Sequence, residues 1–318
     1  MVILVTGGSG FVGSHLLKSL LKHKKEVRVL DIRDCANKDV EFIKGDIRNI
    51  ETLDKVTKNI DSIFHLASLV PQSNVNYSAY VDTIVKGTEN TLKICLAKNI
   101  KLVHVSSSGV YGGGRQFPLK EDDPKNPQGA YGITKWQAEI KCQEYVKKGV
   151  DVVIVRPMAI IGPGIYGVFK KFISYVHNSY PLPTFGNGNN KIQMVSVHDC
   201  VDALLLAEKY IKPGETFNLG SDNIPTVKEE FKSLIDYSKS KSIVLPVPAI
   251  LARTGCKILY KLKISPLTPE HYYVLDKNSI LDNTKAKTLL GWTPKFDNIQ
   301  MLKEAYDWYV NETSIQHH

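Results

Sequence analysis

The chain lacks the long apolar segments that a bilayer-spanning helix requires. The longest apolar stretches, such as Ile243 to Leu251 with its Pro246 and Pro248, are short, whereas a span needs about 18 or more apolar residues in succession. The N-terminus has no basic region and reaches a glycine-rich segment too early for a signal peptide. We therefore expect neither a transmembrane helix nor export.

Cysteine is scarce, and what there is forms no recognisable pattern. The five cysteines are an odd number, lie far apart, and include no Cys-x-x-Cys pair or neighbouring histidine at metal-ligand spacing. This distribution argues against a disulfide scaffold and a zinc site. It favours a cytoplasmic protein with reduced thiols and no bound metal.

Acidic residues are in deficit, because 41 Lys and Arg face 32 Asp and Glu, giving a net charge of +9. The basic residues are scattered in short groups such as 22–25 and 147–148, unlike the concentrated patch that nucleic-acid binding requires. We expect no nucleic acid. The excess of positive charge would attract an anionic substrate, an acidic partner or a membrane surface equally well. A general positive field increases the rate of encounter with any of these and does not select among them.

Short β-branched runs alternate with helical patterns over the first 160 residues, which predicts a doubly wound parallel α/β sheet covered on both faces. Strands are expected at Val2–Thr6, Glu26–Leu30, Glu41–Lys44, Ser62–Leu66, Lys101–Ser106 and Val152–Arg156. Helices are expected at Phe11–Leu21, Ile50–Lys58, Tyr77–Lys98 and Tyr131–Lys148.

The pattern loosens after Gly162-Pro163-Gly164, which predicts a smaller second lobe. We divide the chain into a sheet domain, residues 1–160 with 195–222 rejoining the sheet, a substrate-binding lobe, and a tail. The lobe comprises 161–194 and 223–310, and the tail, 311–318, is polar enough to be frayed.

A glycine-rich turn links the first strand to the first helix. Gly7, Gly10 and Gly13 are three residues apart there and enclose Phe11 and Val12. Glycine permits a tight turn and close approach of the backbone to a ligand, and the N–H groups at a helix start bind phosphate. The turn is therefore expected to bind the pyrophosphate of a dinucleotide.

Asp31 follows the second strand and can accept hydrogen bonds from both ribose hydroxyls of an adenosine, with Ile32 and Arg33 beside it. A 2′-phosphate would meet like charge there. NAD is therefore favoured over NADP, although Arg33 is a residue type that can accommodate that phosphate.

Tyr131 and Lys135 lie four residues apart on one face of an expected helix. The spacing recurs at Tyr166/Lys170, Tyr237/Lys241 and Tyr273/Lys277, but only Tyr131 follows a strand that ends in the hydroxyls of Ser106, Ser107 and Ser108. A nearby ammonium and a nicotinamide cation would both lower a phenol pKa. The set predicts a general acid/base that exchanges a hydroxyl proton while a cofactor carries hydride.

At this point the chain resembles the extended short-chain dehydrogenase/reductase family over nearly its whole length. The motifs that carry the resemblance are Thr6–Gly13, Asp31, Gly45–Ile47, His65–Ala67, Ser106–Gly112, Tyr131–Lys135 and Arg156-Pro157. The family contains nucleotide-sugar epimerases, dehydratases and 3β-hydroxysteroid dehydrogenases. The resemblance implies a Rossmann-type fold and an NAD-dependent enzyme.

Position by position, the resemblance implies the following roles. Ser107, Tyr131 and Lys135 would be catalytic, and Lys135 would also hold a ribose. Further cofactor contacts would come from Asp46, Ile47, Leu66, Ala67, Ser106 and Pro157. Substrate contacts are expected from Ser108, Tyr111, Ala159 and Lys191.

Two departures from the family pattern weaken a sugar-nucleotide substrate. Ala159 stands where many sugar-nucleotide members have Asn, and Ile192 stands where many have an Arg for the diphosphate. The acidic pair used by sugar 4,6-dehydratases is absent, because Ser108-Gly109 occupies its place. We rank a nucleotide-sugar epimerase or reductase ahead of an apolar-alcohol, 3β-hydroxysteroid-type dehydrogenase, and both ahead of a non-catalytic NAD-binding scaffold.

Two surfaces are expected to meet partners. Family members pair two long helices in a dimer, so the resemblance implies a homodimer through 77–98 and 131–148. The segment 245–263 is apolar with basic residues interspersed. It predicts either an amphipathic helix packed on the lobe or a peripheral contact with a membrane.

Overall fold

The computed structural model describes residues 1–72, 74–112, 117–265 and 267–315. Within these ranges the main feature is a seven-stranded sheet in which each pair of neighbouring strands is parallel. Its strands, in spatial order, are β10 (Thr216–Leu219), β6 (Val152–Pro157), β5 (Lys101–Val105), β4 (Ser62–His65), β1 (Val2–Thr6), β2 (Glu26–Asp31) and β3 (Glu41–Lys44). This confirms the doubly wound α/β fold class. The strand order reverses between β1 and β4, because β2 and β3 follow β1 on one side while β4, β5 and β6 continue on the other. Sheets of this type bind ligands at such a reversal point.

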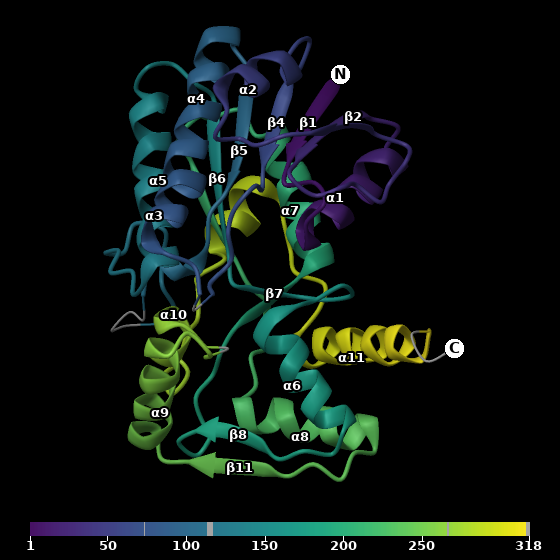
Figure 1. Cartoon of the computed structure of the whole chain (residues 1–318), viewed down its shortest axis with the longest axis vertical. Helices are drawn as coiled ribbons and strands as arrows, with labels where there is room; N and C mark the ends of the chain where they lie inside the picture. Colours follow the sequence, from purple (N-terminus) through teal and green to yellow (C-terminus); the bar gives the residue numbers. More distant parts are fainter. Residues whose placement is uncertain (73, 113–116, 266, 316–318) are drawn as a thin grey trace.

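Helices cover both faces of the sheet (Figure 1). One face is covered by α1 (Phe11–Lys22) and α7 (Val197–Lys209), and the other by α2 (Ile50–Val56), α4 (Gly87–Lys98) and α5 (Ala130–Val146). Alternate strand residues supply the two cores, so Ile3 and Val5 pack with α1 while Leu4 packs with α2. Continuous apolar strands follow from burial on both faces.

The expected helix over 77–98 is divided into three consecutive segments. It begins as α3 (Tyr77–Tyr80), continues as a π-helical segment over Val81–Lys86, and regains α geometry at Gly87. A Cβ on Gly87 would lie 2.5 Å from the side chain of Ile47. The helix therefore approaches the loop after β3 more closely than any other residue type would permit, and periodicity alone did not indicate this change of pitch.

The second lobe lies below the sheet in Figure 1. It contains two pairs of parallel strands, β7 (Ala159–Ile161) with β9 (Met194–Ser196) and β8 (Leu182–Phe185) with β11 (Val244–Val247). Its helices are α6 (Gly167–His177), α8 (Val227–Ser238), α9 (Ala249–Lys261), α10 (Pro269–Tyr272) and α11 (Asn298–Ile315). Between β8 and α6, α8 and α11 lies the apolar core of this lobe, separate from the two cores of the sheet domain.

The end of α11 corrects one expectation. Residues 311–315 are helical rather than frayed, because α11 docks Met301, Ala305 and Tyr309 into the core of the second lobe and its last turns continue from there. Residues 316–318 lie outside the described residues. No helix in the described part of the chain combines the length and the hydrophobicity needed to cross a bilayer.

Candidate active site

The glycine turn leaves no room for side chains. Gly7 adopts a φ of +75°, and a Cβ there would lie 2.6 Å from the backbone nitrogen of Ala67. A Cβ on Gly13 would collide with the carbonyl oxygen of Gly7. Gly10 precedes α1 and offers no side-chain cap for its first N–H groups. The turn, with Phe11 and Val12 in the first turn of the helix, therefore suits the close approach of a pyrophosphate.

Asp31 lies at the end of β2 directly beside this turn. Its carboxylate accepts hydrogen bonds from the backbone N–H of Ser9 at 3.0 Å and of Arg33 at 2.9 Å. The side chain is buried, whereas Ile32 and Arg33 are exposed. Each carboxylate oxygen retains acceptor capacity, so Asp31 can still accept from the two hydroxyls of a ribose.

Four further predicted cofactor residues lie at the same carboxyl-terminal ends of the strands as the glycine turn and Asp31. Leu66 donates its N–H to the Thr6 carbonyl at 3.0 Å, and Ala67 lies against Gly7. Ile47 is buried beneath Gly87. Asp46 accepts from the Arg48 guanidinium at 2.6 Å, and this hydrogen bond lowers the pKa of the carboxyl. These residues therefore surround the carboxyl ends of β1, β3 and β4.

The three predicted catalytic residues come together where β5 ends and α5 begins. The Ser107 Oγ accepts from the Gly109 N–H at 3.1 Å, and a Cβ on Gly109 would lie 3.4 Å from that Oγ and 3.8 Å from the Tyr131 ring. The Lys135 ammonium lies 5.8 Å from the centre of the same ring and donates to the Val105 carbonyl at 2.8 Å. The structure therefore groups the serine, the phenol and the ammonium at the carboxyl end of β5, on the same side of the sheet as the glycine turn and two strands away from it.

The ionisation of Tyr131 differs from the sequence-based expectation. Burial raises the pKa of its phenol well above the ordinary value of 10.0, and the hydrogen bond with Ser107 opposes this only in part. Burial also lowers the pKa of Lys135 to about 8, against the opposing charge of Glu139. Within the protein groups alone, desolvation therefore decides the direction of the Tyr131 pKa shift. The expected lowering of that pKa also involves the charge of a nicotinamide, and it stays a prediction.

Two residues of the second lobe reach the site, and sequence reasoning missed both. A carboxylate oxygen of Glu270 accepts from the Tyr131 backbone N–H at 2.8 Å, at the start of α5. Tyr166 packs edge-to-face on Phe11 with 6.1 Å between ring centres, and it raises the pKa of Tyr131. A Pro at the first position of the short helix α10 was the only local signal for Glu270, since its partner lies 139 residues away.

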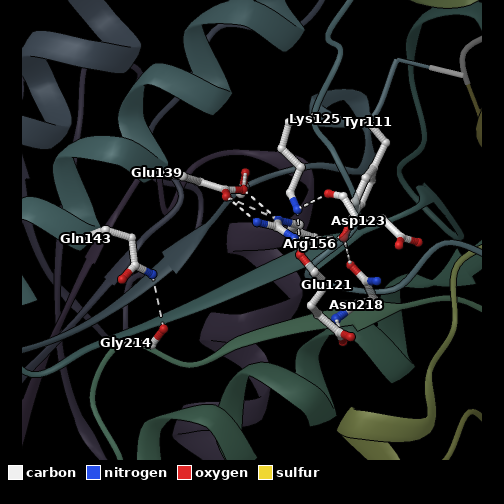
Figure 2. Close-up of polar contacts among 10 residues, drawn as sticks. Tyr111, Glu121, Asp123, Lys125, Glu139, Gln143, Arg156, Gly214 and Asn218 are labelled. Atoms are coloured by element: carbon white, nitrogen blue, oxygen red, sulfur yellow. Dashed lines mark hydrogen bonds and ion pairs between the residues drawn. The ribbon is translucent and has the colours of Figure 1, made fainter. Parts of the chain in front are cut away.

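A buried polar network lies beneath the site (Figure 2). Its centre is an ion pair between Arg156 of β6 and Glu139 of α5, with 2.6 Å between Nη2 and Oε2 and side chains only 4% and 1% exposed. Arg156 also donates to the Tyr111 hydroxyl at 2.7 Å, which donates in turn to Asn218 at 2.9 Å. The Ser106 hydroxyl donates to Glu139. The network ties the elements that carry Ser107, Lys135 and Pro157.

This network includes two of the predicted site residues. Tyr111 is 2% exposed and its hydroxyl is bonded to Arg156 and Asn218, so its side chain is part of the buried network, and its contact with substrate stays a prediction. Ser106 is equally buried, and its hydroxyl donates to Glu139. A motif position shows that a polar side chain is present without showing the direction in which it points, and only the structure gave these two directions.

The other predicted residues are spread over the two lobes. Ser108 is half-buried in a 3₁₀ turn immediately after Ser107, and Pro157 is buried at the end of β6. Ala159 lies in β7, half-buried against the apolar core of the second lobe. Lys191 is exposed in the second lobe, where its backbone is bonded to Asn278. Ser108 and Pro157 therefore lie at the carboxyl ends of β5 and β6, whereas Lys191 lies on the second lobe.

The parallel sheet, the glycine turn and the serine, tyrosine and lysine together define a dinucleotide-binding α/β protein built for acid/base chemistry at an alcohol. Residues 3–220 match the model of the NAD dependent epimerase/dehydratase family. The chain therefore belongs to that family, which confirms the resemblance found in the sequence and the expectation of an NAD-dependent enzyme.

Individual relatives match over nearly the whole chain. An uncharacterised protein of Sinorhizobium fredii is 32% identical, covering 98% of this chain and 80% of its own. A putative UDP-glucose 4-epimerase of Methanocaldococcus jannaschii is 31% identical, covering 98% and 99%. Among solved structures, UDP-glucose 4-epimerase of Thermotoga maritima with UDP-glucose is 26% identical, with a TM-score of 0.83 and coverage of 98% and 100%.

Proposed function

We propose that this chain transfers hydride reversibly between NAD and a secondary alcohol carbon of a nucleotide-activated sugar, as a 4-epimerase or a reductase. The main support for the proposal is the grouping of Ser107, Tyr131 and Lys135 at the carboxyl end of β5. A non-catalytic NAD-binding scaffold would have no need of a half-buried phenol and hydroxyl beside a buried ammonium.

The glycine turn after β1 and the carboxylate at the end of β2 support NAD as the bound group. Gly7, Gly10 and Gly13 would hold its pyrophosphate against α1, and Asp31 would accept from the adenosine ribose. Lys135 would donate to the second ribose. A bound NAD held by these residues would supply reversible hydride transfer with the alcohol carbon.

Tyr131 would exchange the proton of the substrate hydroxyl. Because burial raises its pKa, the phenol is protonated in this arrangement and is ready to donate a proton to a ketone oxygen. To act as a base it needs a further positive charge nearby, which an oxidised nicotinamide supplies. Ser107 would hold the same substrate oxygen by a hydrogen bond. A ketone that stays bound and is reduced from its other face yields an epimer, whereas a released ketone completes a dehydrogenation.

The names of the relatives favour a nucleotide sugar as the substrate. The proteins from Methanocaldococcus jannaschii and Thermotoga maritima are described as UDP-glucose 4-epimerases, and a UDP-glucuronic acid 4-epimerase of Bacillus cereus is 26% identical with a TM-score of 0.82. Ala159 and Ile192 favour a second candidate, an apolar secondary alcohol of the 3β-hydroxysteroid type. They offer no polar group to a buried diphosphate.

We also propose a cytoplasmic homodimer. The outer sides of α3, α4 and α5 carry large exposed apolar residues, namely Tyr77, Leu96 and Ile140. Such residues favour a partner, and a second copy with the same helices would bury them by symmetry. Within the described residues the cysteines are free thiols, which suits a reducing compartment.

Replacement of Tyr131 by Phe tests the proposed chemistry. Turnover should fall at least about a hundredfold because the proton carrier is lost, while NAD binding measured by calorimetry persists. Tyr237→Phe is the matched control, since Tyr237 has the same spacing to a lysine but is exposed and bonded to Asp307 in the other lobe. Equal turnover of the Tyr131 variant and the wild type would remove Tyr131 from the mechanism.

A substrate screen separates the two candidate classes. UDP-glucose, UDP-glucuronic acid and a 3β-hydroxysteroid are each incubated with the enzyme and NAD. Chromatography detects a changed sugar stereocentre, and absorbance detects released NADH. An epimerised UDP-sugar supports the first candidate, and NADH produced only with the steroid supports the second.

A further inference from the structure

Helix α9 (Ala249–Lys261) presents its apolar side chains to solvent. Ile250 is 73% exposed, Leu251 62% and Ile258 55%, and Leu262 just beyond the helix is 62% exposed. Leu251, Ile258 and Leu262 lie seven and four residues apart and Ile250 adjoins Leu251, so the four fall on one side of the helix and form a stripe. No residue of α9 is buried. Large exposed apolar surfaces on folded proteins mark sites that bind another protein, a membrane or a ligand.

The opposite side of α9 attaches the helix to its lobe. Arg253 forms an ion pair with Asp276 at 2.5 Å, and the ring of Tyr260 meets that of Tyr272 with 6.4 Å between centres. An ordinary amphipathic surface helix packs its apolar stripe inward and leaves its polar side in water. This helix is held by an ion pair and an aromatic contact, and its aliphatic stripe faces outward. The helix therefore packs on the lobe through one side, as one of the two expected alternatives required, and leaves its aliphatic stripe in solvent.

The surroundings of the stripe are basic. Between Lys239 and Thr268 the sequence contains no Asp or Glu, and its basic residues are Lys239, Lys241, Arg253, Lys257, Lys261 and Lys263. Arg253 is paired with Asp276, whereas Lys257, Lys261 and Lys263 are exposed next to the stripe. The apolar surface also continues past the helix through Ile264, which is 65% exposed. A partner for this face must therefore accept aliphatic side chains and carry negative charge.

We propose that the stripe, Ile250, Leu251, Ile258 and Leu262, binds the surface of an anionic lipid bilayer, with α9 lying in the plane of the interface. The aliphatic side chains enter the boundary between headgroups and acyl chains, and the long lysine side chains reach the negative headgroups. A second copy of the chain fits less well, because two such faces in contact would bring their uncompensated lysines together. The proposal is independent of the reaction at Tyr131.

Vesicle co-sedimentation tests the proposal directly. The full-length protein should sediment with vesicles of phosphatidylcholine and phosphatidylserine, bind weakly to vesicles of phosphatidylcholine alone, and be released by high salt. One variant replaces Ile250, Leu251 and Ile258 together by Ser, and should lose binding because the inserted side chains are gone. A second carries Lys261→Gln and Lys263→Gln and should bind about thirtyfold more weakly, at about 1 kcal/mol for each lysine.

Ile211→Ser is the matched control, because Ile211 is 84% exposed but lies between α7 and β10, away from α9. This variant should bind as the wild type does. NAD binding of every variant, measured by calorimetry, verifies that the sheet domain is folded, and the substitutions remove only exposed side chains. Failure of the wild type to bind the anionic vesicles would overturn the proposal. It would also be overturned if the triple Ser variant bound vesicles normally but changed from an oligomer to a monomer in sedimentation velocity.

Discussion

The sheet domain and the second lobe use their apolar residues in opposite ways. Every residue of β6 is buried, and the strands around it have apolar side chains on both faces. In the second lobe, no residue of α9 is buried and its most apolar stripe is exposed. Apolar sequence therefore predicts burial where helices cover both sides of a sheet, but in a small lobe it can equally mark a binding surface.

The largest expected effect concerns charge burial in the two regions. Glu139→Gln should lower the free energy of unfolding by about 3–5 kcal/mol, because Arg156 would keep a buried charge without its counter-ion. In the second lobe, Asp276→Asn opposite the more accessible Arg253 should cost about 1 kcal/mol or less. Urea unfolding of both variants measures the difference. Similar losses would show that burial does not distinguish the two ion pairs.

Glycine provides a second contrast. Gly13→Ala should lower stability by about 1–3 kcal/mol, since its methyl group meets the backbone of the glycine turn, which cannot move aside easily. It should also weaken NAD binding. Gly255→Ala in α9 meets nothing within 4 Å and should stabilise the helix by up to about 1 kcal/mol. A Gly13 variant with normal stability and NAD affinity would show that the turn tolerates side chains.

The last contrast is a pH dependence of stability that has opposite signs in the two regions. In the sheet domain, burial lowers the pKa of His65 to about 3 and that of His104 well below its ordinary value of 6.5. The unfolded chain binds protons that the folded chain does not, so stability should fall as the pH drops below 6.5, by about 1 kcal/mol per pH unit for each histidine.

Glu230 of α8 opposes this dependence. Burial raises the pKa of its carboxyl from 4.5 to about 8. Between these pH values the folded state holds a proton that the unfolded state releases. The stability that this proton provides is therefore lost as the pH rises from 4.5 to 8. Glu230→Gln should therefore make the acid-side decline steeper. Unfolding free energies of wild type and variant between pH 5 and about 6.5 measure this, and parallel profiles would contradict it.

The elements of the sheet domain were largely predictable because local signals agree with tertiary structure there. Strands and glycines alternate at the spacing that a parallel sheet requires, and β1 and β3 have the predicted bounds. Four Tyr-x-x-x-Lys pairs exist, and only the position of Tyr131 after the serine-ending strand distinguished it. The directions of Ser106 and Tyr111, by contrast, depend on Arg156 and Glu139, which are distant in sequence.

The sequence by itself determined the fold class, the glycine turn with the acidic residue after β2, and the residues proposed for proton transfer, because periodicity, glycine turns and motif spacing are local properties of the chain. Only the tertiary structure decided how burial shifts the pKa of Tyr131, which contact Glu270 makes with its backbone, and which face of α9 meets solvent. Those properties depend on neighbours far apart in the chain. Desolvation and packing are set by three-dimensional surroundings that no local pattern contains.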